Sequence, residues 1–288
     1  MKNTCMKSSK IIGFALVVLG LISFVLWNAA ITEDRHGILT VSFLDVGQGD
    51  SVFIDAPSGR QVLIDGGPDT SVLRRLSAVV PWYDRTIDVV IPTHPDADHV
   101  AGLIDVLARY RVSYVIQSSV LGDTATWKAL EKSVAKEGSI NSIAHRGQII
   151  VLGKGAYLEV LSPDRLVPNL ETNTACVVMR LIYGNTSFML PCDAPQAMEK
   201  YLVQLDGENL KSTVLKPGHH GSKTSSSALF LGYVDPEIAV YSRGCDNKYG
   251  HPNKETIAIF ALFGIPTLDT CTEGTVTFVS DGKKVWRK

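Results

Sequence analysis

Apolar residues occur in one long run near the start of the chain and in many short runs after it. The long run, residues 11–31, reaches the roughly 20 positions that a helix needs to cross the hydrocarbon core of a bilayer. Three Lys precede this run and Glu33 and Asp34 follow it, so the positive-inside rule places the N-terminus in the cytoplasm. The pattern predicts a single transmembrane helix at the cell membrane, with the rest of the chain outside the cytoplasm.

A cleaved signal peptide is the alternative to an anchor, because signal peptides also begin with basic residues. Their apolar core is usually about 7 to 15 residues, shorter than this run, and Asn28-Ala29-Ala30 is a poor cleavage site. The anchor is therefore favoured, and cleavage would instead give a secreted protein. Both interpretations divide the chain into residues 1–32, the N-terminus and its apolar segment, and residues 33–288, an extracytoplasmic domain.

The short runs from residue 38 onward alternate between the periods of strands and helices. Strands are predicted over residues 38–46, 51–55, 61–65, 87–91, 112–116, 157–161, 176–183, 187–190, 212–216, 237–241, 275–279 and 283–286. Helices are predicted over residues 70–80, 100–110, 127–137, 195–204, 225–231 and 254–263. Two strand-rich halves with interspersed helices predict an α/β (α+β) domain of two stacked sheets covered by helices.

Composition and charge then narrow the classes of protein. With 45% hydrophobic and 20% charged residues over 288 positions, the chain is neither disordered nor a coiled coil. Without residues 1–32 it keeps 25 basic and 29 acidic side chains, a net charge near −4. Bulk electrostatics therefore do not indicate nucleic-acid binding, and a polyanion would have to be held by a local site.

Four cysteines, Cys176, Cys192, Cys245 and Cys271, lie in the extracytoplasmic part, where disulfides are permitted. They allow three pairings, among which the sequence does not choose. The alternative is that all four are small buried residues in strands.

The segment from His94 to His99 carries the chemistry, because His94, Asp96, Asp98 and His99 place four potential metal ligands within six residues. The segment follows a short apolar strand, so the ligands lie at the carboxyl end of that strand. Folding alone does not require four such residues at this spacing. Two carboxylates and two imidazoles suit Zn²⁺, Mn²⁺ or Fe, and the mixed set suits two ions better than one.

The chain resembles the metallo-β-lactamase fold family and, within it, the hydrolase domain of ComEC-type competence proteins. The matches, in chain order, are Phe43 to Ser51, Leu63 to Gly67, Thr93 to His99, Asn173, Asp193, His219 to Ser227, and Tyr249 to Pro252. They cover about residues 38 to 286, and the first motif and the His-His-Gly-Ser motif are specific to this branch. We expect no membrane channel domains of the kind that accompany this domain in ComEC proteins, so a role in DNA uptake would need a partner channel.

The resemblance implies an αββα sandwich with two divalent metal ions, Zn²⁺ or alternatively Mn²⁺, at one edge of the sheets. In that picture His94 and Asp96 hold one ion, Asp98 and His99 hold the other, and Asp193 bridges both.

The late histidines have two assignments under the resemblance. Either His219 or His220 contacts the scissile group and His251 completes the second metal site, or the reverse holds. Ser222 and Lys223, at the predicted start of a helix, suit an anion site, because a helix N-terminus offers backbone N–H donors and Lys223 adds a charge.

Other matching residues are expected around the ligands. Asp65 is expected to orient a ligand, and Asn173 to contact the site. Asp45, Gln48 and Asp50 either line the site or stabilise a bend in the chain. Cys192, which stands where the family has Gly, is expected to pack rather than to alter metal preference.

The expected chemistry is hydrolysis by a metal-activated hydroxide. Asp98 would orient the nucleophile or accept its proton, and His219 or His220 would stabilise the oxyanion or protonate the leaving group. The ComEC-like motifs favour a phosphodiesterase or nuclease acting on DNA or RNA. A small-molecule hydrolase for a β-lactam, lactone or thioester is the alternative, and a non-catalytic binding module is disfavoured because every ligand position is filled.

Overall fold

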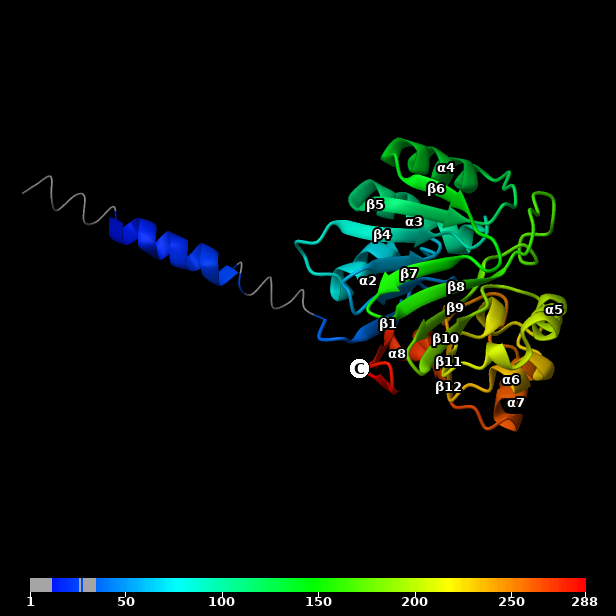
Figure 1. Cartoon of the computed structure of the whole chain (residues 1–288). Helices are drawn as coiled ribbons and strands as arrows, with labels where there is room; N and C mark the ends of the chain where they lie inside the picture. Colours follow the sequence, from blue (N-terminus) through cyan, green and yellow to red (C-terminus); the bar gives the residue numbers. More distant parts are fainter. Residues whose placement is uncertain (1–11, 26, 28–34) are drawn as a thin grey trace, which may run out of the picture. The chain divides into compact units, whose positions relative to one another are not determined.

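The computed structural model describes residues 12–25, residue 27 and residues 35–288. The chain separates into two units, Met1–His36 and Gly37–Lys288, and the first contains a helix over residues 12–25 (Figure 1). Among the described residues, no helix has both the length and the apolar character that a bilayer span requires. The rest of the predicted span, residues 11, 26 and 28–31, lies outside the described part of the chain, and so do the residues of the poor cleavage site at 28–30.

The second unit is built on two sheets. The first has eight strands, in the order β15 (Val285–Arg287), β14 (Val276–Ser280), β1 (Leu39–Phe43), β2 (Val52–Asp55), β3 (Gln61–Ile64), β4 (Thr86–Ile91), β5 (Arg111–Gln117) and β6 (Ile140–Ile143). The second has seven, in the order β13 (Thr267–Asp269), β12 (Ile238–Tyr241), β11 (Val214–Leu215), β10 (Thr186–Leu190), β9 (Val178–Tyr183), β8 (Ala156–Ser162) and β7 (Ile149–Gly153). Strands β3 to β6 are parallel to one another, and so are strands β10 to β13.

Helices lie against the outer face of each sheet (Figure 1). The first sheet carries α2 (Ser71–Val79), α3 (Ala97–Arg109) and α4 (Ala125–Glu137). The second carries α5 (Gln196–Asp206), α6 (Ala228–Val234) and α7 (Lys254–Leu262). Short elements complete the unit, namely α8 (Thr270–Glu273) and the 3-10 turns η1 (Gly207–Leu210) and η2 (Gly218–Gly221).

The inner core lies between the two sheets. Alternate residues of β1 and β8 point into it, because successive side chains of a strand face opposite sides. Phe278 of the first sheet packs edge to face against Phe188 of the second, with ring centroids 6.4 Å apart. Full burial of one such side chain contributes roughly 1.5 to 3 kcal/mol. The predicted arrangement of two stacked sheets covered by helices is confirmed.

The missed strands are β6, β7 and β13, which form three of the four sheet edges. Edge strands are short and partly exposed, so they carry little periodic signal. The predicted helix over residues 225–231 is placed too early, since α6 begins at Ala228 and is capped by the Ser227 hydroxyl.

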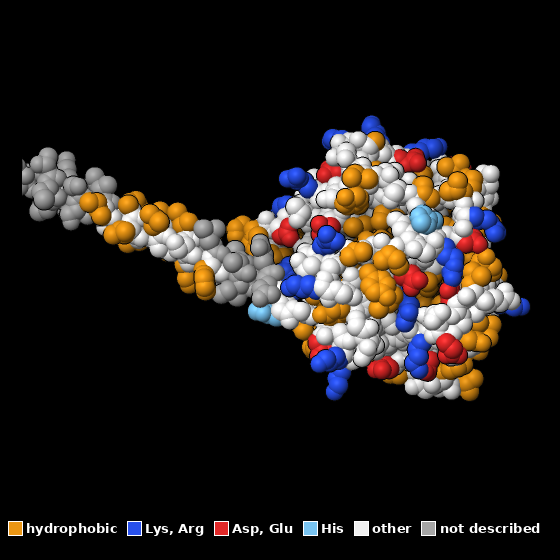
Figure 2. All heavy atoms as spheres, in the orientation of Figure 1, with side chains coloured by type: hydrophobic (Ala, Val, Ile, Leu, Met, Phe, Trp, Pro, Cys, Tyr) orange, Lys and Arg blue, Asp and Glu red, His pale blue; other side chains and the backbone are white. Residues whose placement is uncertain are grey.

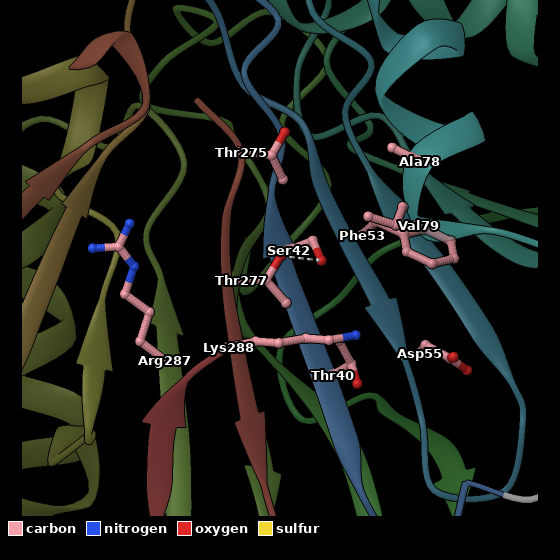
Figure 3. A pocket seen from close by; sticks show the side chains of 10 residues that line it. All are labelled: Thr40, Ser42, Phe53, Asp55, Ala78, Val79, Thr275, Thr277, Arg287 and Lys288. Atoms are coloured by element: carbon pink, nitrogen blue, oxygen red, sulfur yellow. Dashed lines mark hydrogen bonds between the residues drawn. The ribbon is translucent and has the colours of Figure 1, made fainter. Parts of the chain in front are cut away.

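The helices leave part of the first sheet's outer face uncovered. Polar side chains of β1 and β14 point there, and Ser42 and Thr277 form a hydrogen bond of 3.0 Å. With α2 and the C-terminal residues they line a cavity of about 330 Å³ (Figure 3). The predicted metal ligands and catalytic residues are not among the residues that line it.

Candidate metal centre

Loops at the carboxyl ends of five strands meet at one edge of the two sheets. In the first sheet Asp65 follows β3 and the segment His94 to His99 follows β4. In the second, Asp193 follows β10, His219 and His220 follow β11, and His251 follows β12. Parallel strands end at the same edge, and the two stacked sheets bring both sets of loops together.

The loop after β4 leads directly into α3, which fixes three of its four candidate ligands. Asp96 is the N-cap residue of α3, and Asp98 and His99 lie in its first turn. The loop between β1 and β2 packs closely on this turn, where the Asp50 backbone N–H donates to the Asp98 carbonyl at 3.3 Å. Gly49 permits this approach, because a Cβ there would lie 2.1 Å from the same carbonyl oxygen.

Asp65 orients the first ligand loop. One carboxylate oxygen accepts from the Thr93 backbone N–H at 2.8 Å, and the other accepts from the Thr93 hydroxyl at 2.7 Å. The second oxygen also accepts from His99 Nδ1 at 2.8 Å. A proton on Nδ1 leaves His99 Nε2 with a free lone pair, as second-sphere carboxylates do for metal-ligating histidines.

Three histidines direct an unpartnered nitrogen into the centre. The Nε2 atoms of His94, His99 and His220 are buried and make no hydrogen bond. The carboxylate of Asp193 lies between two of them, with its Oδ2 3.3 Å from His99 Nε2 and 3.4 Å from His220 Nε2. Asp98 Oδ2 lies 3.4 Å from the same nitrogen of His220. Unsatisfied buried nitrogens facing carboxylates are the donor set that a divalent ion would complete.

Among the described residues, four groups of three side chains have ligand atoms that all lie within 4.8 Å of one another. The groups are His94 with His99 and Asp193; Asp98 with His99 and His220; Asp50 with Asp65 and His99; and Asp50 with Asp193 and His220. Of the late histidines, His220 therefore joins the centre. Asp96 and His251 belong to none of the four groups, although Asp96 Oδ2 is 3.6 Å from His94 Nε2.

The electrostatics of the centre favour positive charge. Burial would lower the pKa of His220, but the carboxylates of Asp193 and Asp50 raise it to about 9. His99 follows the same pattern, because Asp193 and Asp65 outweigh burial and hold its pKa well above the usual value. Burial would raise the pKa of Asp193, but His220 and His99 hold it well below its usual value. A region that stabilises cationic groups so strongly suits divalent cations.

Lys216, which the sequence reasoning missed, is the buried cation beside the centre. Its ammonium forms an ion pair with Asp50 Oδ2 and lies 3.9 Å from Asp193 Oδ1. Asp50 in turn lies 3.2 Å from His220 Nδ1, which also contacts the Ser242 carbonyl at 3.0 Å. Burial would lower the pKa of Lys216, but Asp50 and Asp193 raise it, so the side chain stays charged. A Lys at the end of a short apolar strand was the available signal, since Lys is rarely buried unless paired.

His219 and His251 lie at the outer side of the centre. The His219 side chain is 30% exposed, and its Nε2 is 3.7 Å from Asp193 Oδ2. The His251 ring lies 5.7 Å from the His219 ring and 6.4 Å from the His220 ring. Burial and the nearby His220 lower the pKa of His251 to about 4, and burial lowers that of His219, so both are neutral near pH 7.

The His219-His220 turn has an unusual backbone. His219 and His220 both adopt left-handed conformations, with φ of 50° and 55°. Two successive non-glycine residues in this region cost about 1 to 3 kcal/mol each, and such strain is typical of functional sites. The turn is what brings two adjacent imidazoles to the same centre.

The predicted anion site at the start of α6 is not free to bind an anion. The backbone N–H groups of Ser226 and Ser227 donate to the two carboxylate oxygens of Glu199, at 2.5 and 2.8 Å. Ser222 is hydrogen-bonded to Thr224 at 2.9 Å, and Lys223 is exposed. Burial raises the pKa of Glu199 to about 7, against the effect of the hydrogen bonds from Ser227 and Ser226.

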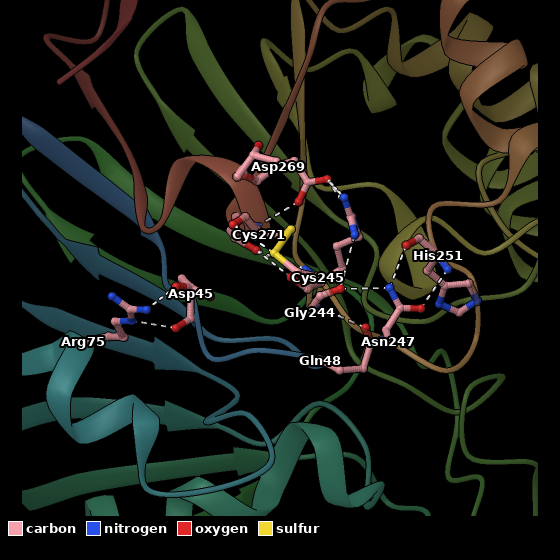
Figure 4. The surroundings of a disulfide bond; sticks show 12 residues. Asp45, Gln48, Arg75, Gly244, Cys245, Asn247, His251, Asp269 and Cys271 are labelled. Atoms are coloured by element: carbon pink, nitrogen blue, oxygen red, sulfur yellow. Dashed lines mark hydrogen bonds and ion pairs between the residues drawn. A yellow bond between two sulfur atoms is a disulfide. The ribbon is translucent and has the colours of Figure 1, made fainter.

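The remaining predicted residues join neighbouring loops. Asp45 forms an ion pair with Arg75 of α2, and Gln48 Oε1 accepts from the Gly244 N–H at 3.2 Å (Figure 4). The Asn173 amide oxygen is buried without a hydrogen-bond partner. The adjacent Thr172 contacts Asp96, whose pKa is lowered by hydrogen bonds with His94 and Thr172.

The four cysteines divide into one disulfide and two buried thiols. Cys245 and Cys271 are bonded, while Cys176 and Cys192 are free and buried. Cys192 Sγ lies 3.3 Å from His94 Nδ1, on the opposite side of the ring from the unpartnered Nε2. Burial holds its pKa well above the usual value, so Cys192 packs as a neutral thiol.

Comparison with known proteins gives a family and several relatives. A sequence profile of the Metallo-beta-lactamase superfamily matches residues 44–244. The chain is 29% identical over 261 residues to ComE operon protein 3 of Bacillus subtilis, which covers 83% of this chain and 32% of that protein. It is 30% identical over 265 residues to competence protein ComA of Neisseria gonorrhoeae, which covers 91% of this chain and 35% of that protein. The chain thus spans about a third of the length of these relatives.

Solved structures share the fold at low identity. The chain resembles the metallo-beta-lactamase fold protein YhfI from Bacillus subtilis, with a TM-score of 0.54 and 13% identity over 87% of this chain and 100% of that one. It also resembles Zn²⁺-bound PqqB from Methylobacterium extorquens, with a TM-score of 0.52 and 13% identity over 83% of this chain and 99% of that one. At these identities the likeness shows the fold alone.

Proposed function

The chain belongs to the metallo-beta-lactamase superfamily, and from this we propose that it is a membrane-tethered, extracytoplasmic phosphodiesterase that cleaves DNA with two divalent metal ions. The fold and the ligand groups are those of a metal-dependent hydrolase. The observation that carries the proposal is the set of three buried, unpartnered Nε2 atoms around the Asp193 carboxylate.

The residues fit two divalent ions that bind nitrogen and oxygen ligands. We propose Zn²⁺ for both ions, with Mn²⁺ as the alternative. We assign His94 and Asp96 to one ion, and Asp98, His99 and His220 to the other, with Asp193 shared. We place His220 rather than His251 as the ligand that completes the second metal site, the reverse of the first assignment expected from the sequence, because the His220 Nε2 faces Asp98 and Asp193. Bound ions would supply Lewis acidity and lower the pKa of a bound water to give hydroxide at neutral pH.

The protein groups around the ligands have separate tasks in this proposal. Asp98, whose side chain is partly exposed, orients the nucleophile or accepts its proton. His219 lies on the open side next to Asp193 and faces the scissile group, where it donates a hydrogen bond to the developing oxyanion or leaving oxygen. Lys216 keeps Asp50 ionised and in place behind His220.

DNA is proposed as the substrate because one of the named relatives is a competence protein, ComA of Neisseria gonorrhoeae, and the sequence motifs resemble those of ComEC-type competence proteins. Acidic and basic side chains are interspersed over the face of the domain shown in Figure 2, so that face offers no broad basic surface among the described residues. The strand would therefore be held locally, at the centre and its rim. A role in DNA uptake, together with a channel supplied by a partner protein, extends the same proposal.

The extracytoplasmic location is supported by the disulfide and by the N-terminal apolar run. Cys245 and Cys271 are bonded in a folded domain, and such bonds persist in oxidising compartments. Fusing a reporter that is active only outside the cytoplasm to the C-terminus tests the topology. Reporter activity in the membrane fraction is expected, whereas an inactive reporter would contradict it.

Cleavage assays test the function. The full chain in detergent is stripped of metal and given single- and double-stranded DNA before and after addition of Zn²⁺ or Mn²⁺. Cutting is expected only with metal, is lost in Asp98→Ala, and persists in the control Asp123→Asn, which changes an exposed loop residue. Failure to cut any nucleic acid, together with turnover of a lactam, lactone or thioester, would replace this proposal with a small-molecule hydrolase.

A further inference from the structure

The loop after β12, residues 243–252, forms a fixed rim beside the metal centre, and we call it the rim loop. The Cys245–Cys271 disulfide ties its start to α8, and Gln48 accepts the Gly244 N–H (Figure 4). The approach is close, because a Cβ on Gly244 would lie 2.9 Å from the Gln48 backbone nitrogen. The first half of the rim loop is therefore fixed to α8 and to the loop between β1 and β2.

Asn247 fixes the second half of the rim loop. Its side-chain amide donates to the Gly244 and His251 carbonyls at 2.9 and 2.8 Å, and its amide oxygen accepts from the His251 N–H at 2.8 Å (Figure 4). Asn253, the first residue after the rim loop, donates its backbone N–H to the Gly221 carbonyl at 3.0 Å. The loop is thus positioned relative to the His219-His220 turn.

This fixed loop presents an aromatic ring and a cation to solvent. Tyr249 is 54% exposed, and its ring stacks on His251 with centroids 5.6 Å apart and planes 22° apart. The ammonium of the exposed Lys248 lies 5.1 Å from the centre of the Tyr249 ring. His251 in turn lies 5.7 Å from His219, so two ring contacts join Tyr249 to the group that faces the scissile bond. Core packing does not account for a large exposed ring on a loop with this many restraints.

We propose that Tyr249 and Lys248 form a subsite for single-stranded nucleic acid, in which Lys248 moves from the Tyr249 ring to an adjacent phosphate and an unpaired base next to the bond to be cut stacks on Tyr249 in its place. Sequence-independent binding of single strands combines a positive charge that follows the backbone with aromatic rings on which bases stack. A base inside a duplex has both faces covered by its neighbours and would have to leave the stack first. The subsite therefore selects single strands over duplexes.

This inference rests on the proposed function, so its test separates binding from catalysis. Binding of a fluorescein-labelled ten-residue oligothymidine to the full chain is measured with chelator present, by anisotropy over a series of salt concentrations. Tyr249→Ala is expected to weaken binding by about 5- to 150-fold, the effect of losing one base–aromatic stack. A plot of the logarithm of the binding constant against the logarithm of the salt concentration has a negative slope. Lys248→Ala is expected to reduce the magnitude of this slope by about 0.7, the value for one phosphate contact to a single strand.

Matched variants separate stacking from loop structure. Tyr249→Phe and Tyr249→Trp keep an aromatic face and should bind like the parent, whereas Tyr249→Leu keeps apolar bulk and should bind like Tyr249→Ala. A 2-aminopurine base placed next to the cleavage position should lose fluorescence on binding to the parent but not to Tyr249→Leu. Equal affinity of the parent, Tyr249→Leu and Tyr249→Ala, or equal affinity for the oligothymidine and a blunt duplex, would overturn the subsite.

A small phosphodiester distinguishes the two possible failures. Hydrolysis of bis(p-nitrophenyl) phosphate by the metal-loaded parent reports on the metal centre without requiring an oligonucleotide to bind. Hydrolysis of this diester with no effect of Tyr249 on oligonucleotide binding would reject the subsite and keep the phosphodiesterase. Stacking of the oligonucleotide on Tyr249 with no turnover of any phosphodiester would keep the subsite and reject the phosphodiesterase.

Discussion

The two sides of the candidate centre are built in different ways. The first sheet contributes His94, Asp98 and His99 from one loop and the first turn of α3, so their spacing follows from six consecutive residues. The second contributes Asp193 and His220 from the ends of two neighbouring parallel strands, β10 and β11. The first side is thus local, whereas the second depends on a register in which Met189 lies beside Leu215. Both sides are required, because unpartnered nitrogens from each face the Asp193 carboxylate.

Loss of one ligand from each side should have the same large effect on activity. His99→Gln and His220→Gln are both expected to lower kcat/KM by at least about a hundredfold, since each removes a ligand and the charge stabilisation that it supports. His251→Gln should cause a smaller loss, because its ring lies outside the ligand groups. Kinetics on a phosphodiester at saturating metal provide the comparison, and a tenfold or smaller loss in His220→Gln would contradict the assignment.

Stability should depend on the buried ion pair of the second side. Lys216→Met leaves the Asp50 carboxylate buried without its nearest cation and is expected to lower the free energy of unfolding by about 3 to 5 kcal/mol. The double variant Asp50→Asn, Lys216→Met should recover most of this loss, because no unpaired charge remains. Urea denaturation with chelator present measures both.

The exposed pair between Lys211 and Asp235 is the matched control for that measurement, since both side chains are mostly exposed. Lys211→Met should leave the unfolding midpoint unchanged within error. Equal losses in the free energy of unfolding for Lys211→Met and Lys216→Met would show that burial of the Lys216 ion pair is not the cause of the loss.

Glu199 should make the loop that follows His220 sensitive to pH. Its pKa in the folded state is about 7, above its ordinary value of 4.5, so the folded state binds this proton more tightly than the unfolded chain does. The corresponding stabilisation is complete below about pH 4.5 and is lost as the pH rises through 7. The free energy of unfolding of the parent, relative to Glu199→Gln, should therefore fall over this window by up to about 3 kcal/mol. Denaturation at a series of pH values tests this, and a difference independent of pH would contradict it.

Asp65 should raise the metal affinity of the first side by orienting His99, without binding a metal ion itself. Asp65→Asn replaces the oxygen that accepts from His99 Nδ1 and is expected to weaken metal binding by about 10- to 100-fold. Titration against a competing chelator measures the affinity. Asp45→Asn is the control, because Asp45 is bonded to Arg75 and should leave the affinity unchanged. Equal affinities of the parent and Asp65→Asn would remove Asp65 from the centre.

The sequence was most informative where structure is local. The strand over residues 87–91, the polar segment at its carboxyl end and the following helix were all predicted from periodicity, and the structure contains them as β4 and α3. The edge strands β6, β7 and β13 were missed, because short exposed strands lack a clear period.

The second side could not be predicted from any single stretch of sequence, because it depends on contacts between distant residues. Lys216 acts through Asp50, and the two are far apart in the chain. The choice among His219, His220 and His251 depends on a left-handed turn that no propensity predicts. The expectation of a free anion site before α6 was wrong for a similar reason. Glu199, which lies in α5, accepts hydrogen bonds from the backbone N–H groups of Ser226 and Ser227.

Metal stoichiometry tests the central claim most directly. The full chain, equilibrated with Zn²⁺ and dialysed, is analysed for metal and protein beside His220→Gln and His251→Gln. Two ions per chain in the parent and in His251→Gln, with fewer than two in His220→Gln, is the result that the two-sided centre predicts. One ion or none in the parent, or loss of an ion in His251→Gln but not in His220→Gln, would contradict it.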